Sequence, residues 1–100
     1  MYEAEALFGN MVKGVVDVRR GTLALDAELH SDLEALLLEN GSNQSDLWGI
    51  NLYPDQTGED FLEFDSLINV RPSQGNRSRE VEDESLRLKI RNIIEAKVRL

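Results

Sequence analysis

An arginine-rich segment over residues 71–79 offers the clearest candidate for chemistry in this chain. Its sequence, Arg-Pro-Ser-Gln-Gly-Asn-Arg-Ser-Arg, holds three of the eight arginines. A guanidinium group is a planar fork of N–H donors that suits phosphate or carboxylate. Gly75 and Asn76 tolerate the positive φ angles with which successive backbone N–H groups form an anion-binding concavity. We therefore predict an anion site made by six residues of the segment: Arg71, Ser73, Gly75, Asn76, Arg77 and Arg79.

The same segment has a simpler interpretation as a solvated connector. Glu80, Glu82 and Asp83 follow it directly, and arginines next to carboxylates commonly form exposed ion pairs that bind nothing else. Gly75 also stands alone, so the chain has neither a phosphate-binding loop nor a dinucleotide-binding motif. The sequence leaves the connector and the anion site open as alternatives.

A second candidate is an acidic strand face that includes the one histidine of the chain. Asp26, Glu28 and His30 alternate in the sequence, and alternate residues of a strand share a face. Carboxylates and an imidazole can bind a divalent cation or transfer protons, and Asp65 joins them if the two predicted hairpins are neighbours. Successive residues on one strand face lie about 7 Å apart, which is wide for one ion, and any exposed strand of an acidic protein has this pattern. A metal-assisted hydrolase is therefore the alternative function.

Composition excludes several kinds of chemistry. The chain has no cysteine, which removes disulfides, thiolate nucleophiles and cysteine-based metal sites, and no Gly-x-Ser-x-Gly motif for a nucleophilic serine. The net charge of −8 repels phosphate backbones and disfavours nucleic acid, although Trp48 or Tyr53 could stack on RNA bases beside the arginines. We expect a non-enzymatic binding or regulatory module without a cofactor, whose partner is a protein or a small anionic ligand.

The chain carries no signal that would direct it out of the cytoplasm. No apolar run approaches the roughly 20 residues that cross a membrane, and the N-terminus, Met-Tyr-Glu-Ala-Glu, is acidic where a signal peptide is basic. The absence of cysteine suits a reducing compartment. We therefore predict a cytoplasmic protein without membrane contact.

The elements that position these residues follow from the spacing of apolar side chains. Residues 11–18 and 22–30 have period two and flank an Arg20-Gly21 pair, which predicts a hairpin with a two-residue turn. That turn pairs Val16 with Leu25. A second hairpin is predicted over residues 47–53 and 61–70, and helices over residues 3–8, 31–38 and 83–98.

These elements predict one α+β domain over residues 1–100. Its sheet is four-stranded, mainly antiparallel and made of two hairpins, with helices packed on one face. A homodimer through the other face, or an upstream helix that covers it, would explain why that face is too apolar for full exposure. The residues concerned are Met11, Val15, Leu47, Tyr53, Phe61 and Leu67.

Residues 36–42, 46–54 and 64–79 carry the longest runs of a family pattern. In them the chain resembles an uncharacterised family of small bacterial proteins, a domain of unknown function, with the resemblance extending from about Phe8 to Ile94. It implies no activity, and it implies a longer helix upstream of Phe8, so that Met1 marks a truncated start. Where the family commonly has Gly-Val-Glu-Asp-Pro, this chain has Glu-Val-Glu-Asp-Glu, which leaves the shape and charge of the arginine-rich segment open.

Overall fold

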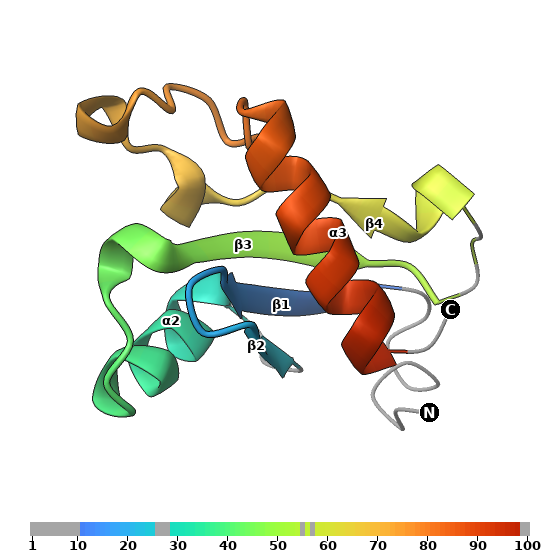
Figure 1. Cartoon of the computed structure of the whole chain (residues 1–100), viewed down its shortest axis with the longest axis horizontal. Coiled ribbons are helices and arrows are strands. Elements are labelled where there is room, and N and C mark those ends of the chain that lie inside the picture. Colours follow the sequence, from blue (N-terminus) through green and yellow to red (C-terminus); the bar gives the residue numbers. More distant parts are fainter. Residues whose placement is uncertain (1–10, 26–28, 55, 57, 99–100) are drawn as a thin grey trace.

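The structure, a computed structural model, describes residues 11–25, 29–54, 56 and 58–98. Within them lie four strands and two α-helices: β1 (Val12–Asp17), β2 (Thr22–Leu25), β3 (Leu47–Leu52), β4 (Leu62–Glu63), α2 (His30–Glu39) and α3 (Glu84–Val98). The strands form one sheet in the order β2-β1-β3-β4, and each neighbouring pair is antiparallel (Figure 1). This confirms the predicted α+β class and the four-stranded antiparallel sheet. The helix predicted upstream lies outside the described residues.

The first hairpin has a four-residue loop, so the predicted two-residue turn is wrong. Val16 pairs with Leu23 instead of Leu25, which is a register shift of two residues. A shift by an even number keeps every side chain on its predicted face. The prediction of which side chains share a face is therefore correct, and the register predicted from a two-residue turn is wrong.

Buried Asp17, at the end of β1, holds this longer loop in place. Its Oδ1 accepts hydrogen bonds from the backbone N–H groups of Arg19 and Arg20, both at 2.9 Å. Its Oδ2 accepts a hydrogen bond from the Ser42 hydroxyl at 2.6 Å, and its backbone carbonyl accepts one from the Gly21 N–H at 2.8 Å. Gly21 has a φ of +70°, which favours glycine. A side-chain carboxylate thus organises the turn.

The second hairpin is shorter than predicted because a side chain replaces part of the strand. β4 ends at Glu63, and the chain then forms a 3₁₀ turn over Leu67–Asn69. The buried Asn69 side chain pairs with the backbone of Gly49 in β3: Oδ1 accepts from its N–H at 2.8 Å and Nδ2 donates to its carbonyl at 3.0 Å. A Cβ on Gly49 would lie 2.5 Å from the Cβ of Ser66. Glycine is therefore required for this close approach.

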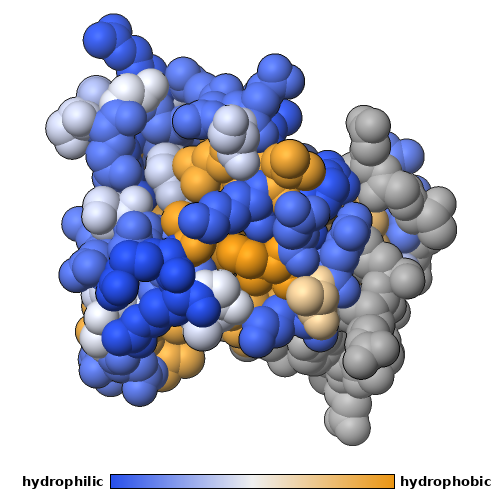
Figure 2. All heavy atoms as spheres, in the orientation of Figure 1, coloured by the Kyte–Doolittle hydropathy of each residue, from blue (hydrophilic) through white to orange (hydrophobic). Residues whose placement is uncertain are grey.

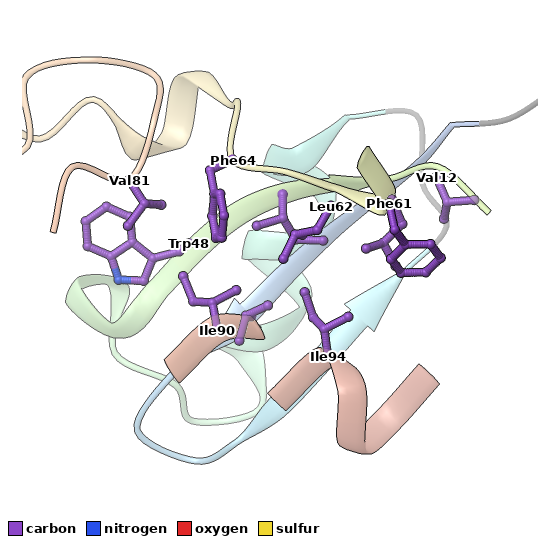
Figure 3. Close-up of a cluster of buried hydrophobic side chains, with 11 residues drawn as sticks. Val12, Trp48, Phe61, Leu62, Phe64, Val81, Ile90 and Ile94 are labelled. Carbon is purple, nitrogen blue, oxygen red and sulfur yellow. The ribbon is translucent and has the colours of Figure 1, made fainter. Parts of the chain in front are cut away.

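Helix α3 covers one face of the sheet and completes the larger core. It crosses the sheet diagonally (Figure 1), and its Ile90 and Ile94 point towards the strands (Figure 3). Apolar residues also reach the surface in the middle of this side of the molecule, among hydrophilic ones (Figure 2). The buried members of this core are Val12, Val16, Trp48, Ile50, Leu52, Phe61, Leu62, Phe64, Val81, Ile90 and Ile94.

Helix α2 lies on the opposite face of the sheet, so the prediction that the helices pack on one face is wrong. Leu33 of α2 packs with Val15 of β1 and Leu47 of β3 in a second, smaller core. Val15 and Val16 are both fully buried, and neighbouring strand residues point to opposite faces, so β1 needs a cover on each side. The chain itself covers part of the apolar second face, and Phe61 belongs to the α3 side.

Candidate functional site

Arg71, the first arginine of the segment, is buried and joins three elements. Its Nε donates to the Ile68 carbonyl at 2.9 Å, and its Nη2 donates to the Leu47 carbonyl. The guanidinium lies 4.7 Å from the centre of the Trp48 ring, and Nη2 lies 3.7 Å from Glu34 Oε2. Burial lowers the pKa of Arg71, although the Glu34 charge opposes this. These contacts give Arg71 a structural role.

Asn76 organises the interior of the segment and is also buried. Its Nδ2 lies within hydrogen-bonding distance of the carbonyls of Asn69, Ser78 and Glu80, at 2.7, 3.1 and 2.6 Å. Its Oδ1 accepts from the Glu82 N–H at 2.8 Å. The side chain therefore satisfies backbone groups of the segment itself.

The backbone N–H groups of Arg77 and Ser78 form a concavity, and the chain's own Glu82 occupies it. Its Oε2 accepts from the N–H groups of Arg77 and Ser78 at 2.9 and 2.8 Å. Hydrogen bonds from Ser78 and Arg77 lower the pKa of Glu82. Gly75, at a φ of +82°, and Ser73 are exposed on the 3₁₀ turn that precedes this concavity. An external anion would have to displace a carboxylate here.

Arg79 combines a fixed backbone with an exposed guanidinium. Its carbonyl accepts from the N–H of Ser66 at 3.0 Å and from Asn69 Nδ2 at 2.9 Å. Its side chain is 53% exposed, and Nε donates to Asp65 Oδ1 at 2.7 Å. The ion pair uses Nε, so the terminal nitrogens Nη1 and Nη2 are not part of it. Arg79 is thus positioned to present N–H donors outward.

Arg79 borders an open groove of about 490 Å³, the polar groove, on the α2 side of β3 and β4. Its polar lining includes Lys13, His30, Asn51, Tyr53, Glu63, Asp65 and Arg79. Met11, Leu29 and Leu67 line it as well and are 37, 57 and 70% exposed. Polar groups beside exposed apolar side chains can bind a small molecule that carries both kinds of group.

A continuous chain of polar contacts runs through this groove. Tyr53 donates its hydroxyl hydrogen to Glu63 Oε1 at 2.7 Å, and Asn51 Nδ2 donates to the same oxygen at 2.9 Å. Asn51 Nδ2 also lies 3.1 Å from the carbonyl of Asp65, whose carboxylate binds Arg79. The hydrogen bond to Glu63 and burial raise the pKa of Tyr53 to about 12. Tyr53 is therefore a hydrogen-bond donor at neutral pH.

His30 lies beside this chain as a neutral ring. Its Nε2 is 2.8 Å from the carbonyl of Ile50, and a carbonyl only accepts, so Nε2 carries the proton. Burial lowers the pKa of His30, and the charge of Lys13 acts in the same direction, while hydrogen bonds with the Ile50 carbonyl and Asn51 and the charge of Asp65 oppose them. At neutral pH the lone pair is on Nδ1.

The polar groove unites residues from both predicted sites. His30 and Asp65 come from the acidic set and Arg79 from the arginine-rich segment; Asp26 and Glu28 lie outside the described residues. Among the residues that the structure describes, no three His, Asp or Glu side chains are placed to hold a metal ion.

Three of the groove residues, Lys13, Asn51 and Glu63, were not predicted as site residues. Asn51 and Glu63 are register partners on β3 and β4, so a correct pairing of the second hairpin would have joined them. Lys13 is the register partner of Asn51 on β1. Polar residues at paired positions on one sheet face were the signal available in the sequence.

A second groove, of about 560 Å³, is also lined by Arg79, together with Glu63 and Asp65. Arg87 lines it, and its Nη2 pairs with Glu80 Oε1 at 2.8 Å while its guanidinium lies 5.0 Å from the Phe64 ring. Its Nε also donates to the Val81 carbonyl, so all three partners of Arg87 belong to the chain. The polar groove is therefore the stronger candidate for a ligand.

None of the described helices is long and apolar enough to cross a membrane. A four-stranded antiparallel sheet with a helix on each face and a polar groove over β3 and β4 defines a small α+β domain. The chain belongs to the family described as "Protein of unknown function (DUF5674)", whose profile matches residues 1–97. This confirms the predicted uncharacterised family. No curated protein and no solved structure matches the chain.

Proposed function

We propose that this protein is a non-enzymatic binding or regulatory module whose polar groove takes an anionic group of a small molecule or a partner protein. Arg79 makes the contact. This proposal rests on the difference in exposure between two arginines of one segment. Arg71 is buried in structural contacts, whereas the side chain of Arg79 is half exposed at the groove, and its Nη1 and Nη2 are outside its ion pair. Lys13 lines the same groove and adds a second positive charge.

Inorganic phosphate and 4-methylpentanoate, a carboxylate with an aliphatic tail, are suitable probes. In an NMR titration we expect both to shift the amide signals of groove residues. Arg79→Gln keeps much of the side-chain length and removes the charge, so affinity should fall about tenfold or more, as for the loss of a charge-assisted hydrogen bond.

Arg77→Gln is the matched control, because Arg77 belongs to the same segment and is exposed, and it does not line the polar groove. Its affinity for both probes should equal that of the wild type. An unchanged affinity in Arg79→Gln, or equal losses in the two variants, would overturn the assignment to Arg79.

A metal-assisted hydrolase is the second candidate, favoured by the presence of His30 and Asp65 in one groove. For such an enzyme, Mn²⁺, Mg²⁺ or Zn²⁺ should raise the melting temperature by mass action. A chelator should reverse the rise, and His30→Ala should diminish it. A melting temperature that none of the three ions changes would remove this candidate.

Four further predictions belong to this proposal. They are a single domain over residues 1–100, a bacterial origin, a cytoplasmic location and a homodimer through the α2 face. Met11 and Leu67 support the last of these, because both are exposed on that face. Exposed apolar residues commonly mark contact surfaces.

A further inference from the structure

We propose that Asn40 and Gly41, at the C-terminal end of α2, form a site of non-enzymatic deamidation, and that the contact between Arg20 and Asn40 controls its rate. Neither residue of the site lines the polar groove, so the inference goes beyond the proposed function and does not depend on it. The modification converts a neutral amide into a carboxylate.

The reactive pair is defined by its residue types. Asparagine is a thermally labile residue, because its side-chain amide can be attacked by the backbone nitrogen of the next residue. A glycine in that next position has no Cβ to hinder the attack, and Asn40-Gly41 is the one Asn-Gly pair of the sequence. Both residues are exposed, so water and hydroxide reach them.

The reaction has two steps and consumes only water. Hydroxide first removes the proton of the Gly41 N–H, and the nitrogen forms a bond to Asn40 Cγ. The bond between Cγ and Nδ2 breaks, Nδ2 leaves as ammonia, and a five-membered succinimide remains. Water then cleaves one of the two C–N bonds in the ring. Cleavage at Cγ gives aspartate, and cleavage at the main-chain carbonyl carbon gives isoaspartate.

The fold requires the glycine of this pair. Gly41 follows the last turn of α2 with a φ of +96°, a conformation that favours glycine at the end of a helix. A Cβ on Gly41 would also lie 2.8 Å from Nη2 of Arg20. The end of α2 therefore retains the residue that makes Asn40 reactive.

Three hydrogen bonds hold the reacting atoms in place. Asn40 Nδ2 donates to the Leu36 carbonyl at 2.9 Å, and the Gly41 N–H donates to the Leu38 carbonyl at 3.1 Å. Nη1 of Arg20 donates to the Asn40 carbonyl at 2.8 Å. The attack requires the Asn40 side chain to leave Leu36 and the Gly41 nitrogen to turn towards Cγ. Deamidation therefore proceeds from conformations in which the end of α2 has opened.

Arg20 supplies the one bond of these three that comes from outside α2. It lies in the loop between β1 and β2, where its backbone N–H is held by buried Asp17 at 2.9 Å. The other two bonds lie within the helix end and break when that end opens. Arg20 thus fastens the end of α2 to the first hairpin, and its removal should favour the opening.

Incubation of the full chain in mildly alkaline buffer, followed by peptide mapping with mass spectrometry, tests the site. Asn92 is the internal reference, because it is exposed and the branched side chain of Ile93 follows it. We expect Asn40 to react faster than Asn92 in urea, and about tenfold or more faster in urea than in the folded chain. Equal rates for the two asparagines in urea would overturn the site, and equal rates for Asn40 in urea and in the folded chain would overturn its protection by the fold.

Arg20→Ala tests the control of the rate. In the folded chain we expect Asn40 to react about threefold or more faster in this variant, as for the loss of one hydrogen bond, and in urea at the wild-type rate. Arg77→Ala removes an exposed arginine from another loop and should leave the rate unchanged. A wild-type rate in folded Arg20→Ala would overturn the role of Arg20.

Ile94→Val separates local opening from global unfolding. Ile94 is buried in the core under α3, so the shorter side chain lowers the stability of the whole domain and leaves the end of α2 intact. We expect Asn40 to react at the wild-type rate in this variant. An increase equal to that in Arg20→Ala would mean that Asn40 reacts only after global unfolding, and it would overturn the control by Arg20.

Discussion

Replacing Arg71 with alanine is expected to lower the free energy of unfolding by about 3 kcal/mol, as for the loss of one partner of a buried ion pair. The guanidinium donates to the carbonyls of Ile68 and Leu47 and covers the Trp48 ring. Alanine leaves both carbonyls without this donor, leaves Glu34 without its ion pair and opens a gap over the indole. Urea unfolding at pH 7, followed by circular dichroism, measures the loss.

Arg77→Ala is the matched control for this prediction. Arg77 is exposed, and its contact with Glu82 uses the backbone N–H, which alanine keeps. A surface change of this kind should alter stability by no more than about 0.5 kcal/mol. Similar effects of the two variants would mean that Arg71 is not the structural arginine of the segment.

Asp17→Ala should also destabilise the protein by about 3 kcal/mol at pH 7, because hydrogen bonds to charged groups contribute about 1.5 to 3 kcal/mol. The carboxylate is fully buried and accepts from the Ser42 hydroxyl and from the N–H groups of Arg19 and Arg20. All three donors lose their acceptor in the variant. Ser42→Ala removes a single one of these bonds and should cost about 1 kcal/mol. An equal loss in both variants would contradict this account.

Asp17 should also make stability depend on acidity. Burial by itself would raise its pKa, but hydrogen bonds from Ser42, Arg20 and Arg19 outweigh it and hold the pKa below the ordinary value of 3.8. The stabilisation is present above that value. It is lost as pH falls below it towards the lower folded pKa, because the unfolded chain takes up the proton first.

Asp17→Asn does not titrate and isolates this contribution. The stability difference between the wild type and Asp17→Asn should be constant above about pH 5 and should shrink below about pH 4. Urea unfolding at each pH measures it. A difference that stays constant down to pH 2.5 would show that the pKa of Asp17 is the same in the folded and unfolded chain.

The polar groove could be predicted only in parts. The sequence pointed to His30, Asp65 and Arg79 as separate candidates, because residue type and local spacing are visible in one dimension. Their meeting depends on long-range pairing: Asn51 contacts Glu63 and Asp65, which follow it by 12 and 14 residues. These groups come together through the strand register, which the alternation of apolar and polar residues does not define by itself.

The arginine-rich segment shows the same limit within nine residues. Its composition predicted exposed arginines and a backbone concavity for an external anion, and the concavity that the Arg77 and Ser78 N–H groups form holds Glu82. Whether an arginine faces solvent or the interior depends on what packs over it, and Arg71 is buried because α2 and β3 supply Glu34 and the Leu47 carbonyl. The occupant of the concavity, Glu82, lies only five residues from Arg77, yet nothing in its residue type distinguishes it from the acids around it.

The sequence by itself determined the α+β class, the strand faces of β1 and the amphipathic helix α3, because each follows from the periodicity of apolar side chains along a short stretch. Only the tertiary structure decided that α2 covers the second face, since leucines on a helix do not specify which surface they bury. It also decided that the side chains of Asp17 and Asn69 make hydrogen bonds to backbone groups of the turn and of β3. Such hydrogen bonds join a side chain to backbone groups whose position depends on the whole fold.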